Sequence, residues 1–374
     1  MRRLAWAAPV VVAGVSFLVF LPALDNGFVW DDRPNLLANP HYRGLGWDRL
    51  RWMATAFHMG HYIPTTWLSL ALDHAAWGMN PVGYHLTNVV LHALNAGLFC
   101  LVAARLLRRA TALTGWPLAV AASGAALFFA IHPLRVESVA WVTERRDLVS
   151  GAFLLVTVLL YLSAGETEGA PRRGWLAASV VTFGLALTAK SIVMTFPAVL
   201  VLLNVYPLGR MTLARPWTGV RRVAWEVSPF LLLSTLLAGA AVAAQMPHAL
   251  GTYPWPTRIA VAFYALWFYL VKTLVPVNLS PLYEVPIPLH PLEPRFVVSV
   301  VGVLAVSAAV VAMRRRWPAG LALWTYYVVA LSPTLGLAVR AGFQLGADRY
   351  TYLACLGWAL LVGTGAGVVA RAHE

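Results

Sequence analysis

The sequence predicts an all-α, polytopic membrane protein with ten or eleven transmembrane helices, and three observations support this. Of its 374 residues, 60% are hydrophobic and only 11% are charged, whereas about a quarter of the residues of a soluble domain are charged. The mean hydropathy is +0.69. A helix takes about 20 residues to cross the hydrocarbon core, so the chain is long enough for about ten crossings. We expect a single membrane domain over residues 1–374, because no internal repeat or low-complexity linker divides it.

We interpret the net charge of +13 as a sign of which loops lie on the cytoplasmic side of the membrane. The arginines come in short clusters between apolar stretches, which is typical of loops that stay in the cytoplasm. We therefore expect no nucleic-acid partner. Cys100 and Cys355 both lie in apolar runs, so neither a disulfide framework nor a zinc site is predicted.

The first element is an apolar run from Leu4 to Leu24 that follows Arg2 and Arg3. It is longer than the apolar region of a signal peptide and lacks a clear small-x-small cleavage site before Asp25. We therefore predict an uncleaved first span with a cytoplasmic amino end. Residues 25–82 would then form an outer loop, within which the amphipathic stretch 62–77 lies at the membrane interface.

The next crossings are predicted at 83–104, 118–131 and 148–163. The run 175–206 has 32 residues, about 48 Å as one helix, and is too long for a core of about 30 Å. It must fold into a hairpin with its break near Lys190 and Ser191. A further crossing at 227–244 follows.

The number of crossings after residue 257 depends on one segment. Four full spans, at 258–275, 296–313, 318–337 and 350–370, place Arg314, Arg315 and Arg316 outside, against the positive-inside rule. If the segment 263–275 is re-entrant or interfacial, these arginines lie inside. The arginines favour this second count, and both remain open.

Function is expected at polar residues that a membrane protein keeps despite their cost. The first group is Asp31-Asp32, just after the first span. Because Pro34 favours an extended Arg33, adjacent side chains should point to opposite faces, and only one aspartate can face a reactant. One would act as a general base or metal ligand; the alternative is a solvated loop turn.

The second group extends from His132 to Asp147. Pro133 should end the preceding helix near Ile131. If the stretch beyond is helical, Glu137 and Glu144 share one face. Three arginines face three carboxylates here, unlike a cytoplasmic anchor loop, which predicts either an organised phosphate-binding network or an interfacial helix held by its own ion pairs. The arginines of this group are Arg135, Arg145 and Arg146.

Two smaller groups complete the set. Lys190 lies at the hairpin break and either reaches an anionic ligand or extends to the lipid headgroups. Asp348-Arg349 precedes the last span and forms either an ion pair or part of a ligand site. No Walker A loop, His-Glu-x-x-His or Gly-x-Ser-x-Gly motif is present, so nucleotide hydrolysis and the chemistries of those motifs are not predicted.

Seven short motifs give the chain a resemblance to a known family. In order they are Phe-Val-Trp-Asp-Asp (28–32), Asn-Pro-Val-Gly-Tyr-His-Leu-Thr-Asn (80–88), His-Pro-Leu-Arg-Val-Glu-Ser-Val-Ala-Trp (132–141), Ala-Lys (189–190), Tyr-Pro-Leu-Gly-Arg (206–210), Pro-Val-Asn-Leu (276–279) and Asp-Arg-Tyr-Thr-Tyr-Leu (348–353). With these the chain resembles the TMTC type of membrane protein, the transmembrane and tetratricopeptide-repeat O-mannosyltransferases, and their bacterial relatives. We expect no tetratricopeptide-repeat domain after the last span, unlike in many relatives, which puts protein O-mannosylation in doubt.

The resemblance implies a GT-C type fold in a bacterial cytoplasmic (inner) membrane. It implies an inverting glycosyltransferase that moves a sugar, with mannose one candidate, from a polyprenyl-phosphate carrier to a protein or glycan acceptor hydroxyl on the non-cytoplasmic face. Asp31 or Asp32 would be the catalytic base. The donor phosphate would be bound by cations chosen from Arg135, Arg145, Arg146, Lys190 and Arg349. The residues that would position these cations or the acceptor are His132, Glu137, Glu144 and Asp348.

Two questions stay open at this point. Asp31 and Asp32 are the only candidate ligands for a divalent cation such as Mg²⁺ or Mn²⁺, and no full ligand set is legible. The competing function is a non-catalytic membrane scaffold or a lipid-linked-sugar transporter with the same fold.

Overall fold

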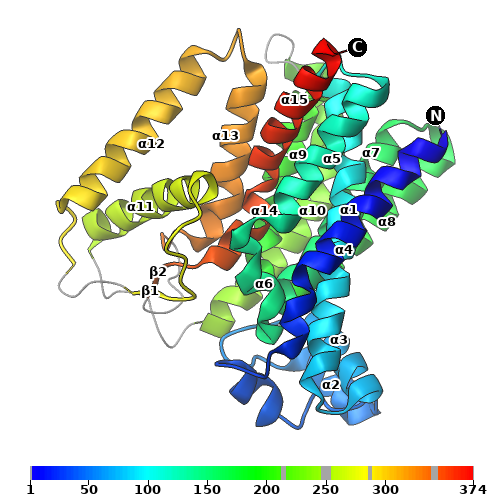
Figure 1. Cartoon of the computed structure of the whole chain (residues 1–374), viewed down its shortest axis with the longest axis vertical. Coiled ribbons are helices and arrows are strands. Elements are labelled where there is room, and N and C mark those ends of the chain that lie inside the picture. The colour runs from blue at the N-terminus through cyan, green and yellow to red at the C-terminus, as the bar shows by residue number, and fades with distance from the viewer. Residues whose placement is uncertain (1, 212–215, 246–253, 285–288, 338–343, 374) are drawn as a thin grey trace.

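The computed structural model describes residues 2–211, 216–245, 254–284, 289–337 and 344–373. Its long helices form a bundle (Figure 1), and the predicted all-α class is confirmed. They are α1 (Arg2–Phe20), α4 (Pro81–Ala110), α5 (Gly115–Ile131), α7 (Arg145–Gly165), α8 (Gly169–Ala189), α9 (Phe196–Val205), α10 (Pro216–Gln245), α11 (Trp255–Leu274), α12 (Pro294–Ala312), α13 (Pro318–Leu331) and α15 (Leu356–Ala372).

Shorter elements connect these helices. They are η1 (Leu21–Asp25), η2 (Arg33–Leu37), α2 (Trp47–Thr55), α3 (Pro64–Trp77), η3 (Pro133–Arg135), α6 (Val136–Ala140), η4 (Val142–Glu144), η5 (Ser191–Thr195), η6 (Ser332–Thr334), η7 (Asp348–Tyr350) and α14 (Thr351–Ala354). Two short antiparallel strands, β1 (Tyr283–Glu284) and β2 (Gln344–Gly346), pair with each other.

Six of the described helices are long and apolar enough to cross a membrane, and the number rises to eight if two bent helix pairs are each counted as one span. One bend, of 57°, separates α5 from the η3–α6 segment, and the other, of 59°, separates the η7–α14 segment from α15. The predicted ten or eleven spans also include α8, α9 and α13; of these, α9 and α13 have only 10 and 14 residues. The chain is therefore a multi-pass membrane protein.

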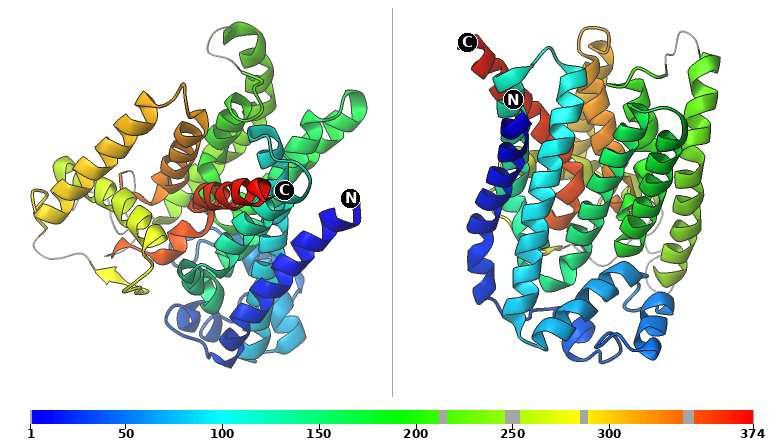
Figure 2. Two further views of the ribbon diagram at one scale, coloured as in Figure 1. Left: turned by 45° about the horizontal axis from the view of Figure 1, so that its top comes forward. Right: turned by 90° about the vertical axis from the view of Figure 1, so that its right-hand side faces the viewer.

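The long apolar run folds into the predicted hairpin. Helix α8 ends at Ala189, Lys190 has extended backbone angles, and η5 and α9 follow. At one end of the hairpin Lys190 contacts the start of α7. At the other end Arg172 bonds the Ala164 carbonyl of α7, and Tyr206 bonds the Ala110 carbonyl of α4. Figure 2 shows the green helices running side by side.

The arginine clusters share one end of the bundle. Trp317, directly after Arg314–Arg316, lines a groove together with Ala110, directly after Arg108–Arg109. Both chain termini lie at this end as well, whereas α11 lies obliquely to the bundle (Figure 1). Under the positive-inside rule this end would be the cytoplasmic one. Because α11 is itself long and apolar enough to cross a membrane, the number of crossings after residue 257 stays a prediction.

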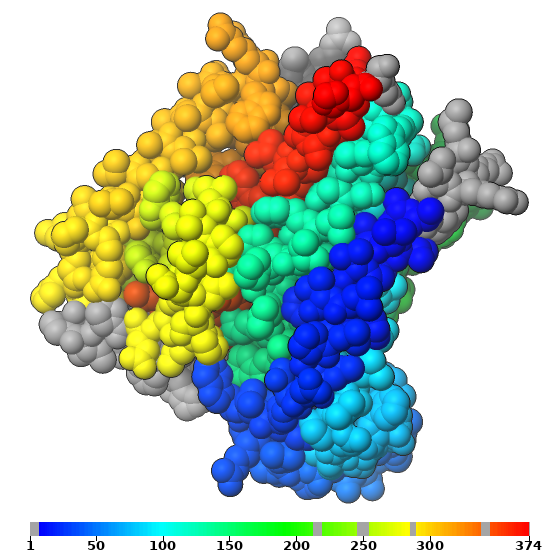
Figure 3. Space-filling model, in the orientation of Figure 1, coloured from blue at the N-terminus to red at the C-terminus, as the bar shows by residue number. Residues whose placement is uncertain are grey.

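Residues 25–80 form a cap at the opposite end. They appear as a blue and cyan lobe below the bundle in Figure 3. Helix α3 covers the predicted amphipathic stretch, and the buried side chains of Tyr42, Met53 and Trp67 form a small core with Tyr84 of α4 and Val142 of η4. The cap therefore has a core of its own and rests on the outer ends of α4 and α7.

The last helix is held by close backbone packing. A Cβ atom on Gly363 of α15 would lie 2.2 Å from the Ala121 carbonyl oxygen of α5. Small residues allow such an approach between membrane helices, where packing replaces the hydrophobic effect as the driving force. This contact fixes α15, and with it the preceding η7 turn that carries Arg349.

Candidate functional site

The acidic pair lies where the cap meets the bundle, and its two carboxylates have different surroundings. Asp32 is fully buried and accepts hydrogen bonds from the Thr143 backbone N–H (2.7 Å), the Thr143 hydroxyl (2.6 Å) and the Val29 N–H (3.0 Å). Burial nevertheless raises the pKa of Asp32, against the lowering effect of these bonds. Asp31 is half-buried and its carboxylate makes no hydrogen bond or ion pair with any residue that the structure describes.

The local backbone differs from the sequence prediction. Arg33 is not extended, because η2 begins at Arg33 and Asp32 already has α-helical angles. The two aspartates still point in different directions, since successive side chains on a helix are about 100° apart. Asp32 fastens the cap to η4, whereas no contact within the described residues fixes the Asp31 carboxylate.

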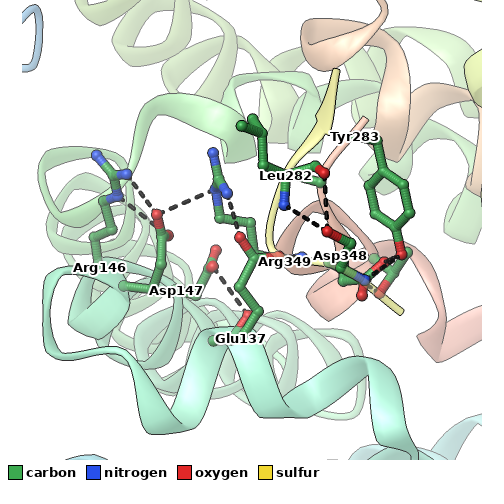
Figure 4. A network of polar contacts seen from close by, with 12 residues as sticks. Glu137, Arg146, Asp147, Leu282, Tyr283, Asp348 and Arg349 are labelled. Atoms are coloured by element: carbon green, nitrogen blue, oxygen red, sulfur yellow. Dashed lines mark hydrogen bonds and ion pairs between the residues drawn. The ribbon is translucent and has the colours of Figure 1, made fainter. Parts of the chain in front are cut away.

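Six charged side chains from three segments meet beside η4. Lys190 Nζ lies 2.9 Å from Glu144 Oε2 and 2.6 Å from Asp147 Oδ1. Arg146 pairs with Glu144 at 2.5 Å. Arg349 forms ion pairs with Glu137 and, at 3.2 Å, with Glu144. Figure 4 shows Glu137, Arg146, Asp147 and Arg349 gathered around one point. We call these six residues the charge cluster: Glu137, Glu144, Arg146, Asp147, Lys190 and Arg349.

The charge cluster is neutral but keeps unused donors. Its three cations balance its three carboxylates, so the cluster can be buried without a large net charge. Lys190 uses two of its three N–H bonds, on Glu144 and Asp147. Arg146 Nη1 and Arg349 Nη2 donate to no residue within the described ranges. Each cation therefore offers an N–H to one further acceptor, which is what an anionic ligand needs.

The segment 132–147 is not one helix. Trp141 is extended and separates α6 from η4, so the predicted stripe is interrupted. Glu137 and Glu144 nevertheless both reach Arg349, from opposite sides of this break. Helix α5 ends at Ile131, as Pro133 predicted.

Two of the five predicted phosphate-binding cations lie outside the charge cluster. Arg145 points the other way and is held by Asp73 (2.6 Å), the Tyr84 carbonyl (2.7 Å) and Asn88. Arg135 is fully buried, donates to Thr351 at 2.7 Å and stacks near the rings of Phe129 and Tyr352. Neither residue lines the cavities described below.

The other predicted positioning residues hold neighbouring segments. His132 contacts the Thr273 carbonyl of α11 at 3.1 Å. Asp348 accepts a hydrogen bond from Tyr283 of β1 at 3.0 Å, and Figure 4 places this pair beyond Arg349. Both residues link the α11–β1 region to the charge cluster and do not join it.

Two cavities meet at the charge cluster. An apolar groove of about 520 Å³ follows α4, α7, α9, α13 and α15, and Asp147, Arg349 and Tyr350 line one end. Along α4 it spans Phe99 to Ala110, about 17 Å at 1.5 Å per residue and more than half of the hydrocarbon core.

A smaller cavity of about 200 Å³ lies on the other side of the cluster. Arg146, Lys190 and Arg349 line it, and the cap contributes His61 and Tyr62. Arg349, Tyr350 and Ile192 line both cavities. A ligand with an apolar tail, an anionic centre and a polar head would find a matching wall for each part.

Several residues of the site were not predicted from sequence. Thr143 and Asp73 make the decisive contacts of Asp32 and Arg145 but belong to no motif of their own. His61 had no sequence signal either, because the Met59-Gly60 pair before it is not one of the Asn-Gly or Asp-Gly pairs that predict a hairpin turn. Among the described residues, no group of three or more His, Cys, Asp or Glu side chains is placed to hold a metal ion.

Comparison with known proteins gives the relatives of this chain. A segment of 218 residues, 54% of the chain, is 30% identical to protein O-mannosyl-transferase TMTC2 of Mus musculus, and 157 residues, 40% of the chain, are 35% identical to protein O-mannosyl-transferase Tmtc1 of Drosophila melanogaster. The chain is a divergent relative of the TMTC O-mannosyltransferases. The resemblance expected from the motifs is thus confirmed.

The similarity covers only part of the TMTC proteins. The matched segments are 24% of the mouse TMTC2 and 17% of the Drosophila Tmtc1, while human TMTC2 matches at 29% identity over 62% of this chain and 28% of its own length. The chain thus spans about a quarter of the length of the TMTC2 proteins it matches. No family model matches it, and no solved structure does.

Proposed function

We propose that this chain is an inverting glycosyltransferase of the GT-C type. It would move a sugar, mannose by the names of its relatives, from a polyprenyl-phosphate carrier to a protein or glycan hydroxyl on the non-cytoplasmic face of a bacterial inner membrane. The observation that carries the proposal is the apolar groove that ends at Arg349 and Asp147, beside the unused N–H groups of the charge cluster.

In this proposal each part of the donor has its own place. The polyprenyl chain would occupy the groove between α4 and α15, because that wall is apolar along its length. The phosphate would lie at the junction and accept N–H bonds from Arg146, Lys190 and Arg349. The sugar would then project into the smaller cavity under the cap.

The proposed reaction has the following steps. Asp31 accepts the proton of the acceptor hydroxyl, and the oxygen attacks the anomeric carbon as the bond from that carbon to the phosphate oxygen breaks. The carbon inverts, and the phosphate leaves with one more negative charge. Donors fixed beforehand around that phosphate stabilise the developing charge more than the ground state.

The test is sugar transfer in isolated membranes that contain the full chain. Polyprenyl-phosphate-mannose is supplied, and the glycans and glycopeptides are read by mass spectrometry. Asp31→Asn should abolish transfer and leave insertion unchanged, because its carboxylate makes no structural contact. Asp25→Asn, at an exposed aspartate at the end of η1, is the matched control. Transfer by Asp31→Asn at the parental rate would overturn the base assignment; absence of transfer by the parent chain would favour a scaffold or a transporter.

A further inference from the structure

The smaller cavity is lined on the cap side by a tight turn that carries His61. The backbone N–H groups of His58 and His61 each bond the other's carbonyl, at 3.0 and 2.9 Å. Between them Met59 has φ of +47° and Gly60 has φ of +75°. Two central residues with positive φ define the type I′ hairpin turn, which a non-glycine residue adopts only at a cost. The turn fixes the direction in which His61 leaves the backbone.

His61 faces the cations of the charge cluster across the cavity. Its charged neighbours are Arg146, Lys190 and Arg349, together with the carboxylate of Glu144. Burial and these cations lower the pKa of His61 to about 3. The imidazole is therefore neutral at physiological pH and offers one N–H donor and one nitrogen acceptor.

Neither ring nitrogen of His61 has a hydrogen-bond partner among the described residues, although the other cap histidines near this turn pack in aromatic contacts. His58 lies against Trp52 and Trp67, and His41 stacks on Trp52. No ring contact holds His61 in the described part of the chain, so packing does not explain a polar ring at this place. His61 is partly exposed and lines the smaller cavity, so both polar atoms of its ring are available to a ligand there.

The nature of that ligand follows from the two cavities, and this step rests on the proposed function. A phosphate binds cations in preference to a neutral ring, and the apolar groove leads away on the other side of the cluster. The group that reaches His61 is therefore the one attached to the phosphate opposite the lipid. A sugar hydroxyl both donates and accepts hydrogen bonds, as a neutral imidazole does.

We infer that His61 binds a hydroxyl of the sugar carried by the lipid-linked donor and so determines which donor the cavity accepts. His61 touches the sugar and not the phosphate. Its removal should weaken the binding of a sugar-bearing donor and leave the binding of the bare polyprenyl phosphate unchanged.

The experiment measures two dissociation constants on the full chain in lipid nanodiscs, one for polyprenyl-phosphate-mannose and one for polyprenyl phosphate. Loss of one neutral hydrogen bond, about 0.5–1.5 kcal/mol, corresponds to about 2- to 13-fold weaker binding. His61→Ala should show this loss for the mannose donor only, and His61→Gln, which keeps a donor and an acceptor, should recover part of it. His74→Ala, a cap histidine on α3 outside both cavities, should bind both ligands like the parent.

The possible outcomes separate failure of the His61 inference from failure of the proposed function. If His61→Ala weakens both ligands equally, the residue acts on the phosphate or on the cap and the inference is wrong. The inference is also wrong if neither ligand is affected. If the parent chain binds neither ligand, the proposed function itself fails, which is a different result from a parent that binds both and an unaffected variant.

Discussion

Lys190 allows the structural and ligand-binding roles of the charge cluster to be separated. Its Nζ contacts Glu144 and Asp147. In Lys190→Met, Glu144 keeps Arg146 and Arg349, but the one hydrogen-bond partner that Asp147 keeps among the described residues is the Ser138 hydroxyl at 3.1 Å. Removing one partner of a buried ion pair typically costs about 3–5 kcal/mol, because the other charge is left uncompensated. We expect a loss of that size in the free energy of unfolding in detergent micelles.

The double variant Lys190→Met/Asp147→Asn should recover most of that loss. It removes the stranded carboxylate together with the cation, so the cluster stays neutral, and replacement of a complete buried pair by neutral side chains is often close to neutral in free energy. The double variant still lacks one of the three N–H donors proposed for the phosphate. A hydrogen bond between charged groups is worth about 1.5–3 kcal/mol, so polyprenyl phosphate should bind about 10- to 150-fold more weakly.

The assay pairs thermal unfolding with polyprenyl-phosphate binding in nanodiscs. Lys272→Met is the matched control, because Lys272 is the only other lysine of the chain and donates to the carbonyls of Val277 and Asn278. It should leave binding unchanged. A double variant that is stable and binds the phosphate like the parent would refute the role of Lys190 in the ligand site and reduce the cluster to a structural ion network.

Two further predictions test the cap and the groove. Burial raises the pKa of Asp32 above its ordinary value of 3.8, so the folded chain holds this proton more tightly than the unfolded chain; stability should fall as the pH rises from about 4 toward the raised pKa and then level off. Asp32→Asn should lose this dependence, measured by tryptophan fluorescence during unfolding, and an unaltered slope would contradict it. Ala322→Trp places a large ring in the groove and should weaken a long-chain polyprenyl phosphate at least about 10-fold while sparing a short-chain analogue. Val298→Trp, on the exposed face of α12, should affect neither ligand, and equal loss for both chain lengths in Ala322→Trp would refute the groove assignment.

The parts of the fold that length and composition control were predictable from sequence. The run 175–206 exceeds the thickness of the hydrocarbon core, so a break was required, and Lys190 is the most costly residue to place in mid-membrane. The arginine clusters in the same way predicted which loops share one end of the bundle. These arguments need no knowledge of which helix packs on which.

The details of the site were not predictable, because they depend on contacts between distant segments. Arg145 and Arg146 are adjacent and chemically identical, yet only Arg146 joins the charge cluster, because α7 directs Arg145 toward Asp73 of the cap. Likewise, Asp32 accepts a hydrogen bond from Thr143, 111 residues away, whereas the Asp31 carboxylate has no such partner among the described residues. Rules that consider only neighbouring residues predict neither Asp73 as the partner of Arg145 nor Thr143 as the partner of Asp32.

The carboxylates of the charge cluster weaken its attraction for an anion. In a transferase this weaker binding is an advantage. Three unpaired cations would bind any phosphate tightly, including the product, but would be expensive to hold inside the membrane when empty. Ion pairs with Glu137, Glu144 and Asp147 lower the cost of burying these cations when no ligand is bound, and they fix the orientation of the cations. In the proposed reaction the unused N–H groups gain most when the phosphate acquires its extra charge, which occurs as the bond to the sugar breaks. A neutral cluster with fixed donors therefore favours the transition state over tight binding of either phosphate, which is what repeated turnover at one site requires.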